Sequence, residues 1–376
     1  ILDDFPDHAD ANHLLGLIAH QLGEHNRAVQ LIDKAIKVNG NAAPFYNNMG
    51  NAQKALGNLK IAVDNYRLSL TVKPDDAGTL SNLGLTFAEL GRSEEAIDCY
   101  KSALRINPDI LATNIRLGIL LDKQGHVDEA IKFFKLAAAI KPDEAEIHNL
   151  LSSTFYKKKL FLDAVASMQM AISINPNDAE QYSYLSSIQL KMNHFEEAAK
   201  SCRMALGINH RNVLAHNNLG VALVEMGCKE GVEASFRNAL KFNPNYTEAL
   251  FNLGCLLEEQ NHLKEAADYY RKAIKVDPNI AETHHSLGNT FQLQDSLIEA
   301  GKAYRRALEL DPVNRQAKVN LSINLLRSGH LKEGWDYYES RFSFAPDQQR
   351  NRKTKAAFFP QPQWDGSTLV EKRIIL

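Results

Sequence analysis

The residues of this chain that could perform catalysis or bind a metal are its 13 histidines and four cysteines. His284 and His285 are adjacent and close to Glu282, a combination that could hold a metal ion. Other histidines recur at equivalent places 34 residues apart, however, and such placement indicates a structural role. The chain has no CxxC, GxGxxG, Walker or HExxH motif, so we expect no catalytic residue, no cofactor and no metal site. The cysteines are Cys99, Cys202, Cys228 and Cys255.

Asparagine recurs at the same 34-residue spacing, and its amide offers a different chemistry. An amide both donates and accepts hydrogen bonds, so a row of amides suits the backbone of an extended peptide, whatever the side chains of that peptide. The alternative is that asparagine only tolerates a solvated helix face or bonds locally, and the sequence leaves both interpretations open. Counted from Ala9, position 6 of successive units holds Asn48, Asn82, Arg116, Leu150, Tyr184, Asn218, Asn252, Ser286 and Asn320.

The candidate peptide-binding site combines this row with neighbouring side chains. Position 13 changes along the chain from lysine to Glu225 and Glu259, which would set the register of a partner with acidic and basic segments. Exposed charges contribute little individually, so a plain solvated surface is the alternative. An apolar wall is expected where the amide row is interrupted, formed by Ile115, Leu150, Tyr184 and Phe251. The polar candidates are Asn48, Asn51, Asn82, Arg116, Tyr184, Asn218, Asn252, Asn289, Asn320, Lys123, Lys157 and Lys191.

The elements that position these residues form ten units of 34 residues, from 9 to 348, without insertion or deletion. Position 8 is always Gly or Ser, as in Gly254, and position 20 is mostly Ala, as in Ala266. Small residues at these places predict two closely packed helices, with positions 8 and 20 facing each other. Position 24 is mostly aromatic and position 7 is Leu or Met, and these large side chains would fill the surrounding space.

Turn signals separate the two helices of each unit and the units themselves. Position 15 is Gly, Asn or Asp in nine units, all residues that tolerate the left-handed conformation that ends a helix, and only Lys159 departs. Position 32 is usually Pro followed by Asp or Asn, which stops the second helix. Each unit is therefore predicted to be helix, turn, helix, turn.

These features, with segments such as Ala249 to Gly254 and Glu265 to Pro278, resemble tetratricopeptide repeats. The resemblance implies an all-α, right-handed solenoid whose first helices line a concave groove that binds a protein or peptide. The position 6 row is similar to the asparagine ladder of O-linked N-acetylglucosamine transferases. Asn51, Asn82 and Arg116 also match part of the carboxylate clamp of co-chaperone repeats, but Asn47 and Ala112 replace its lysines.

The sequence also divides the chain outside the ten repeats. Residues 1–8 are expected to be the end of an upstream repeat, and residues 349–361 a polar, basic linker. Residues 362–376, with the segment around Trp335, resemble the junction at which bacterial proteins fuse such repeats to a glycosyltransferase-like α/β domain. The main prediction is therefore a non-catalytic arm that recruits a partner or substrate to a glycosyltransferase. The alternative is a free-standing scaffold or co-chaperone-like adaptor with no enzyme attached.

Composition narrows the class of partner. The 376 residues carry 43 Lys and Arg against 45 Asp and Glu, so the formal net charge is -2 and a strongly basic nucleic-acid binder is excluded. No stretch is long and apolar enough to predict a membrane span, and the scattered cysteines favour a reducing compartment. We expect a cytoplasmic protein with a protein or peptide partner and no nucleic acid or membrane partner. The sequence leaves a homodimer open.

Overall fold

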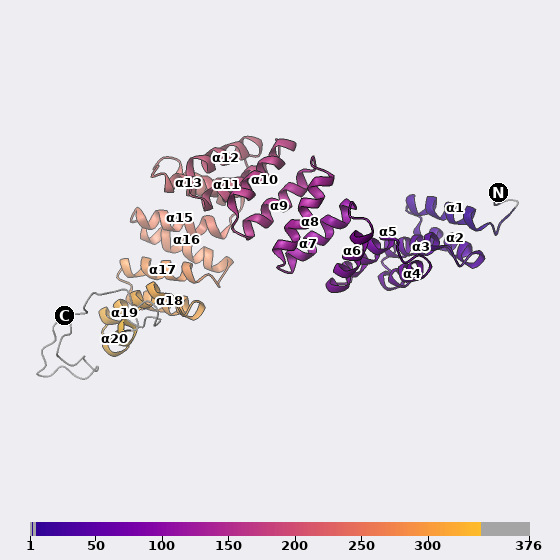
Figure 1. Cartoon of the computed structure of the whole chain (residues 1–376). Coiled ribbons are helices and arrows are strands. Elements are labelled where there is room, and N and C mark those ends of the chain that lie inside the picture. Colours follow the sequence, from indigo (N-terminus) through magenta and orange to yellow (C-terminus); the bar gives the residue numbers. More distant parts are fainter. Residues whose placement is uncertain (1, 3–4, 340–376) are drawn as a thin grey trace, which may run out of the picture. The chain divides into compact units, whose positions relative to one another are not determined.

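A computed structural model gives the fold of residue 2 and residues 5–339, the part of the chain described below (Figure 1). These residues form twenty α-helices, and no β-strand occurs among them, which confirms the all-α prediction for this part of the chain. The predicted linker and the predicted start of an α/β domain, residues 349–376, lie outside the described residues. The chain divides into two compact units, Ile1–Met192 and Asn193–Leu376, and the division falls between the two helices of the sixth repeat.

Both units are series of helix pairs. Unit 1 contains α1 (Ala9–Gln21), α2 (His25–Val38), α3 (Ala43–Ala55), α4 (Leu59–Val72), α5 (Ala77–Glu89), α6 (Ser93–Ile106), α7 (Leu111–Lys123), α8 (Val127–Ile140), α9 (Ala145–Lys157), α10 (Phe161–Ile174) and α11 (Ala179–Lys191). Unit 2 contains α12 (Phe195–Ile208), α13 (Val213–Glu225), α14 (Val232–Phe242), α15 (Thr247–Glu259), α16 (Leu263–Val276), α17 (Ala281–Leu293), α18 (Leu297–Leu310), α19 (Arg315–Arg327) and α20 (Leu331–Glu339).

The helices follow the predicted 34-residue register closely. Each first helix begins at position 1, and each second helix except α14 begins at position 17. Helix α14 begins only at Val232, because Gly231 at its N-terminus has a φ of 82° and therefore cannot belong to a right-handed helix. The local sequence thus fixes where each helix starts and stops.

Six of the seven glycines at position 8 give room to an aromatic ring, and the seventh, Gly16, packs against Ile32. A Cβ atom built on Gly254 would lie 2.6 Å from Cε1 of Tyr270, and the same clash recurs at each glycine of position 8 whose repeat has Tyr or Phe at position 24. The predicted contact between positions 8 and 20 occurs in several repeats: a Cβ on Gly84 would lie 3.2 Å from the carbonyl oxygen of Ala96, and Ser152 Oγ donates to the carbonyl oxygen of Ala164 at 2.8 Å. At Gly254 the nearest atoms belong to the ring of Tyr270. The affected glycines are Gly50, Gly84, Gly118, Gly220, Gly254 and Gly288.

The turn prediction for position 15 is confirmed, including at its exception. The glycines there have φ values between 69° and 83°, and Asn193, Asn261 and Asp295 are also left-handed. Lys159 adopts the same conformation with a φ of 61°, although its side chain disfavours it. The turn geometry is therefore common to all ten repeats, and Lys159 is strained to match it.

Within each unit, the first helices lie closer together than the second helices. Consecutive first helices contact each other, as α3 does α5 in unit 1 and α15 does α17 in unit 2, whereas no two consecutive second helices in the described residues are in comparable contact. We call the surface formed by the first helices the first-helix face and the opposite surface the second-helix face. The closer spacing puts the first-helix face on the inner side of each unit. None of the twenty described helices combines the length and the hydropathy that a membrane span requires.

Candidate functional site

The position 6 amides on the first-helix face are tied to the repeat that precedes them. In unit 1, Asn82 Nδ2 donates to Asn47 Oδ1 at 3.2 Å. In unit 2, Asn252 Nδ2 donates to Asn217 Oδ1 at 2.9 Å. These partners are 35 residues apart, one more than the repeat length, so position 6 bonds to position 5 of the preceding repeat. Equivalent positions are 34 residues apart, so a comparison of equivalent positions in the sequence does not reveal this ladder.

Histidine replaces the acceptor amide at the two ends of the described repeats. Asn48 Nδ2 lies 2.8 Å from His13 Nε2, and Asn320 Nδ2 lies 3.0 Å from His285 Nε2. Because Nδ2 of an amide can only donate, each imidazole nitrogen must accept, so both rings are neutral in this arrangement. Burial lowers the pKa of His13 and of His285 and thereby favours the same neutral form.

Burial separates the amides of the row. Asn48, Asn82, Asn252 and Asn320 are half-buried. Asn48, Asn82 and Asn252 each retain a second N–H group beyond the bond to the preceding repeat, whereas Asn320 uses both of its N–H groups, on His285 and Asn289. Asn218 is buried, with 5% of its surface exposed. Asn218 therefore does not share the partial exposure of the other amides of the row.

Asn51 and Asn289, one turn after position 6, bind tyrosines of the core. Tyr66 donates its hydroxyl to Asn51 Oδ1 at 2.8 Å, and Tyr304 donates to Asn289 Oδ1 at 2.9 Å. Asn320 Nδ2 also donates to Asn289 at 2.8 Å. These amides therefore orient the buried tyrosines of their own repeats.

Two of the residues that match part of the carboxylate clamp have partners within the protein. Asn51 and Asn82 are both hydrogen-bonded within the protein. Arg116 is half-buried. The pKa of the nearby Lys54 is lowered mainly by burial, and the positive charge of Arg116 lowers it further. The first-helix face therefore does present a cationic group beside the amides in unit 1, although Asn47 and Ala112 are not lysines.

Beyond Arg116, the first-helix face of unit 1 carries lysines and an exposed aromatic ring. Lys123, Lys157 and Lys191 are all exposed, but Lys157 Nζ is 2.5 Å from Asp122 Oδ2 and is neutralised by that pair. Tyr184 is 57% exposed, which is unusual for a ring on a packed helix. Ile115 and Leu150 pack partly into the hydrophobic core, so Tyr184 is the member of the expected apolar wall that a partner in unit 1 can reach.

In unit 2 the remaining member of the expected apolar wall, Phe251, packs against other side chains of the protein. The ring of Phe251 lies 5.8 Å from the ring of Tyr270, centroid to centroid, and Phe251 packs against the core of the unit. Glu225 and Glu259 at position 13 are exposed. The surface of unit 2 that can bind a partner is therefore mainly amide and acidic in character.

The histidines at position 4 have a structural partner. Nε2 of His148, His216 and His284 lies 2.8, 2.9 and 3.0 Å from the carbonyl oxygen of the residue six places earlier, in the turn between repeats. A hydrogen bond to this carbonyl secures the turn onto the first helix. No group of three or more His, Cys, Asp or Glu suited to a metal ion occurs in the described part of the chain.

Two of the cysteine thiols, those of Cys99 and Cys255, are poor nucleophiles. The four cysteines form no disulfide, and burial raises the pKa of Cys99 and of Cys255 to about 11. A thiol with such a pKa is almost entirely protonated at neutral pH, and the thiolate is the reactive form.

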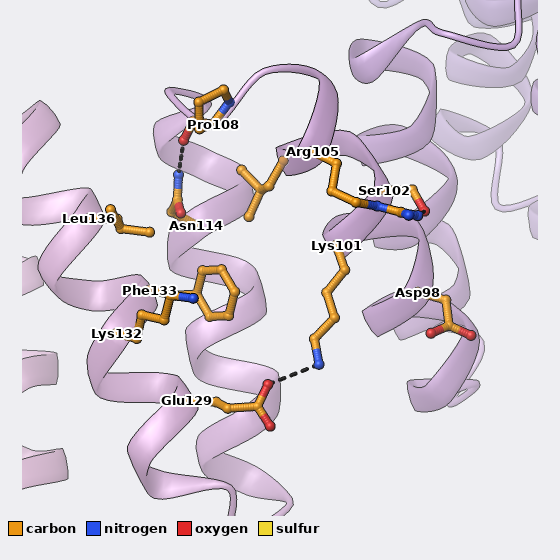
Figure 2. Close-up of a pocket in the computed structure, with 11 residues that line it drawn as sticks. Asp98, Lys101, Ser102, Arg105, Pro108, Asn114, Glu129, Lys132, Phe133 and Leu136 are labelled. Atoms are coloured by element: carbon orange, nitrogen blue, oxygen red, sulfur yellow. Dashed lines mark hydrogen bonds and ion pairs between the residues drawn. The ribbon is translucent and has the colours of Figure 1, made fainter.

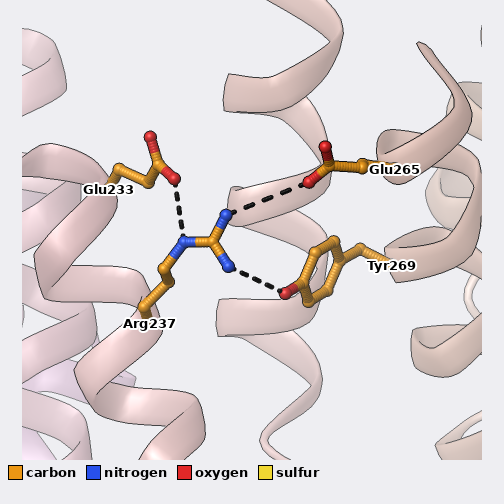
Figure 3. Close-up of polar contacts among 4 residues, drawn as sticks. All are labelled: Glu233, Arg237, Glu265 and Tyr269. Carbon is orange, nitrogen blue, oxygen red and sulfur yellow. Dashed lines mark hydrogen bonds and ion pairs between the residues drawn. The ribbon is translucent and has the colours of Figure 1, made fainter. Parts of the chain in front are cut away.

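The second-helix face carries ion pairs between neighbouring repeats. A cation at position 25 pairs with a glutamate at position 19 of the next repeat in Lys101–Glu129, at 2.9 Å, and in Arg305–Glu333, at 2.8 Å. In Figure 3, Arg237 binds Glu233 at 2.8 Å, lies 4.0 Å from Glu265 and donates to the hydroxyl of Tyr269 at 3.3 Å. The bond to Glu233 is the main reason that the pKa of Arg237 is raised. These side chains are largely exposed, so each pair contributes little to stability.

Ten helix pairs of one length, with these turns and this packing, define a tetratricopeptide-repeat protein. Models described as tetratricopeptide repeat match residues 38–109, and 9–41 and 281–314. The family described as the Cilia and flagella-associated protein 70 C-terminal domain matches residues 76–286, more than half of the chain, and the chain belongs to that family. No curated protein matches the chain.

Several solved structures are similar to this chain. The crystal structure of MamA is 22% identical, covers 45% of this chain and 92% of its own, and has a TM-score of 0.43. YrrB, described as a TPR protein with an unusual peptide-binding site, is 18% identical, covers 50% of this chain and 97% of its own, and has a TM-score of 0.46. The Cut9–Hcn1 hetero-tetramer of the APC/C is 14% identical, covers 84% of this chain and 76% of its own, and has a TM-score of 0.54. This last likeness supports the fold alone.

Proposed function

We propose that the chain is a protein-interaction module whose first-helix face binds an extended segment of a partner protein. The observation that carries this proposal is the set of half-buried amides whose orientation is fixed by bonds between repeats. An amide held in place loses little conformational freedom when a ligand binds, so its remaining hydrogen-bonding capacity is available at low entropic cost. Hydrogen bonds to a peptide backbone would then give affinity with little dependence on side chains.

The two units would select different segments. In unit 1, exposed Lys123 and Lys191 and the ring of Tyr184 favour an acidic segment with an apolar residue. In unit 2, exposed Glu225 and Glu259 disfavour such a segment and leave Asn252 and Asn320 as the main contacts. YrrB is described as a TPR protein with an unusual peptide-binding site, and this description supports peptide binding by this class of repeat in general.

The test begins with peptides selected from a random displayed library on the immobilised chain. The double variant Asn252→Ala and Asn320→Ala removes two backbone contacts of about 1 kcal/mol each, so unit 2 ligands should bind about thirtyfold more weakly. The matched control is Asn238→Ala, an exposed asparagine of α14 on the second-helix face, which should leave affinity unchanged.

Stability must be measured beside affinity, because Asn252 and Asn320 also bond between repeats. We expect the double variant to lose roughly 1–2 kcal/mol of unfolding free energy and to remain folded at the assay temperature. If the folded double variant binds every selected peptide as tightly as the wild type, the amides serve the stack alone and the proposal fails. Lys123→Ala with Lys191→Ala should weaken binding only for acidic peptides, and less as salt is raised.

We also propose that the described repeats are a recruiting arm and not a catalyst. The link to a glycosyltransferase depends on the sequence of residues 362–376, outside the described residues, and the family matches support the repeats alone. The test is to supply nucleotide sugars to the purified chain, alone and with a selected partner. Turnover by the chain that survives further purification would contradict the absence of catalysis.

A further inference from the structure

A carboxylate in the first helices of unit 2 is held in place by two hydroxyl groups. Glu258 lies on α15, six residues after Asn252, and is half-buried. Its Oε2 is 3.2 Å from the hydroxyl of Tyr270 and 2.7 Å from Oγ1 of Thr290 on α17. An ionised carboxylate only accepts hydrogen bonds, so both hydroxyls act as donors to Oε2. The other oxygen, Oε1, makes no hydrogen bond within the described part of the chain and is left for a ligand.

This carboxylate also lacks a counterion. Several other carboxylates of the chain pair with a cation of a neighbouring repeat, as Glu129 does with Lys101 at 2.9 Å (Figure 2). No lysine or arginine of the described residues forms an ion pair with Glu258. A partly desolvated charge without a counterion is unfavourable, so a cation supplied by a partner would gain affinity here.

The first helices around Glu258 carry negative charge alone. Helices α13, α15 and α17 contain neither lysine nor arginine. The pKa of Cys255, which burial raises most, is raised further by the charges of Glu258, Glu282 and Glu259, so these three carboxylates lie around one point of α15. A basic segment of a partner would be complementary to this surface. The glutamates of the three helices are Glu225, Glu248, Glu258, Glu259 and Glu282.

The fold does not require the charge of Glu258. In the next repeat Gln292 occupies the equivalent position, and its Oε1 accepts a hydrogen bond from the hydroxyl of Tyr304 at 2.9 Å. Tyr304 is the equivalent of Tyr270, and both rings are buried. A neutral amide therefore serves the core tyrosine as an acceptor. The carboxylate at Glu258 adds a charge for which the packing of the repeat gives no reason.

We propose that Glu258 selects an arginine in a basic partner segment that binds the first-helix face of unit 2. This rests on the proposed function, in which amides such as Asn252 bind the backbone of the segment. A guanidinium is more weakly hydrated than an ammonium group and loses less on entering a half-buried site. Its planar set of N–H groups also suits a carboxylate that is held in one orientation.

The experiment uses the full chain and the peptide acetyl-Ser-Ala-Arg-Ala-Arg-Ala-Ser-amide. Isothermal titration calorimetry gives the affinity, and the side-chain amide signals of Asn252 in ¹⁵N NMR locate the peptide. We expect these signals to shift on titration. The same peptide with citrulline, which keeps the shape of arginine but is neutral, should bind at least about tenfold more weakly. The peptide with lysine should bind with intermediate affinity.

Protein variants assign the preference to one residue. Glu258→Gln copies Gln292, keeps an acceptor for Tyr270 and should abolish the preference for arginine over citrulline. Glu299→Gln is the matched control, because it removes the same charge from an exposed residue of α18 on the second-helix face, and it should change nothing. Glu225→Gln with Glu259→Gln changes two exposed residues and should weaken arginine binding less than Glu258→Gln, and less still as salt is raised.

Four outcomes would overturn the assignment. These are equal affinity of the wild-type chain for the arginine and citrulline peptides, an unchanged preference in Glu258→Gln, an equally large loss in the Glu225 and Glu259 variant, and no shift of the Asn252 signals. The citrulline comparison uses the wild-type chain, so it decides the question even if Glu258→Gln folds poorly.

Asn252→Ala separates this assignment from the proposed function. If the arginine and citrulline peptides bind equally and Asn252→Ala weakens both, the assignment of Glu258 fails and the proposed function stands. If Glu258→Gln abolishes the preference for arginine but Asn252→Ala has no effect on either peptide, the assignment stands and the backbone contacts of the proposed function are refuted.

Discussion

Gly254 provides the most direct test of how the repeats pack. A Cβ atom at this position would lie 2.6, 2.9 and 3.0 Å from three ring atoms of Tyr270. The ring cannot move away easily, because Tyr270 is 1% exposed and its hydroxyl lies 3.2 Å from Glu258 Oε2 and 3.3 Å from Cys255 Sγ, two acceptors for its one hydrogen. Gly254→Ala should therefore force the ring, and the helix that carries it, to shift.

The magnitude follows from two opposing effects. Alanine is favoured over glycine inside a helix by about 1 kcal/mol. Overpacking of a filled core costs about 1–3 kcal/mol. Gly207→Ala is the matched control in the same unit, because a Cβ there meets no atom within 4 Å and the residue is exposed on α12. Gly207→Ala should stabilise by about 1 kcal/mol, so the two variants should differ by about 1–3 kcal/mol.

The chain itself suggests a rescue. In repeats 5 and 6, position 24 is Met168 and Cys202 in place of an aromatic residue, and position 8 is Ser152 and Ser186 in place of Gly. Tyr270→Met should therefore relieve the clash of Gly254→Ala. A double-mutant cycle should give a favourable coupling of about 1–3 kcal/mol.

The assay is urea unfolding of the full chain, followed by far-UV circular dichroism, for the four members of the cycle and the control. Both sites lie in unit 2, so the same transition reports on all variants. If Gly254→Ala and Gly207→Ala change stability equally, or if the cycle is additive, the ring of Tyr270 does not occupy the space at Gly254 and the packing argument is refuted.

Two further predictions concern a strained turn and two neutral histidines. Lys159→Gly should stabilise unit 1 by about 0.5–1 kcal/mol, because glycine adopts the φ of 61° without strain. Gly125→Lys should destabilise unit 1 for the same reason. If Lys159→Gly does not raise the urea midpoint, Lys159 is not strained. The pKa of His13 and of His285 is lowered from 6.5 in the folded chain, so the unfolded chain binds protons at a higher pH than the folded chain. The stabilisation is therefore complete above pH 6.5 and should be lost as the pH falls from 6.5 through the lower pKa of the folded chain. His13→Asn with His285→Asn, which copies Asn47 and Asn217 at the same position, should flatten urea midpoints between about pH 7 and 5, and an unchanged slope would exclude these histidines as the cause.

The sequence by itself determined the repeat length, the helix pairs and the turns. These features depend on local constraints: the period of apolar residues, the left-handed residue at position 15 and the proline at position 32. Only at Lys159 did the residue type not predict the left-handed turn, because lysine does not favour a positive φ. The sequence also placed the candidate amides on one face of the first helices, since a 34-residue repeat returns each position to the same surface.

Tertiary structure decided which side chains meet. The atoms nearest to Gly254 are those of the Tyr270 ring, because this outcome depends on how two helices are rotated against each other. The bond from Asn252 to Asn217 spans 35 residues because stacked first helices are offset by about one residue, and no local pattern encodes that offset. Local sequence fixes elements, whereas contacts between elements depend on the rotation and offset of whole helices, which many residues set together.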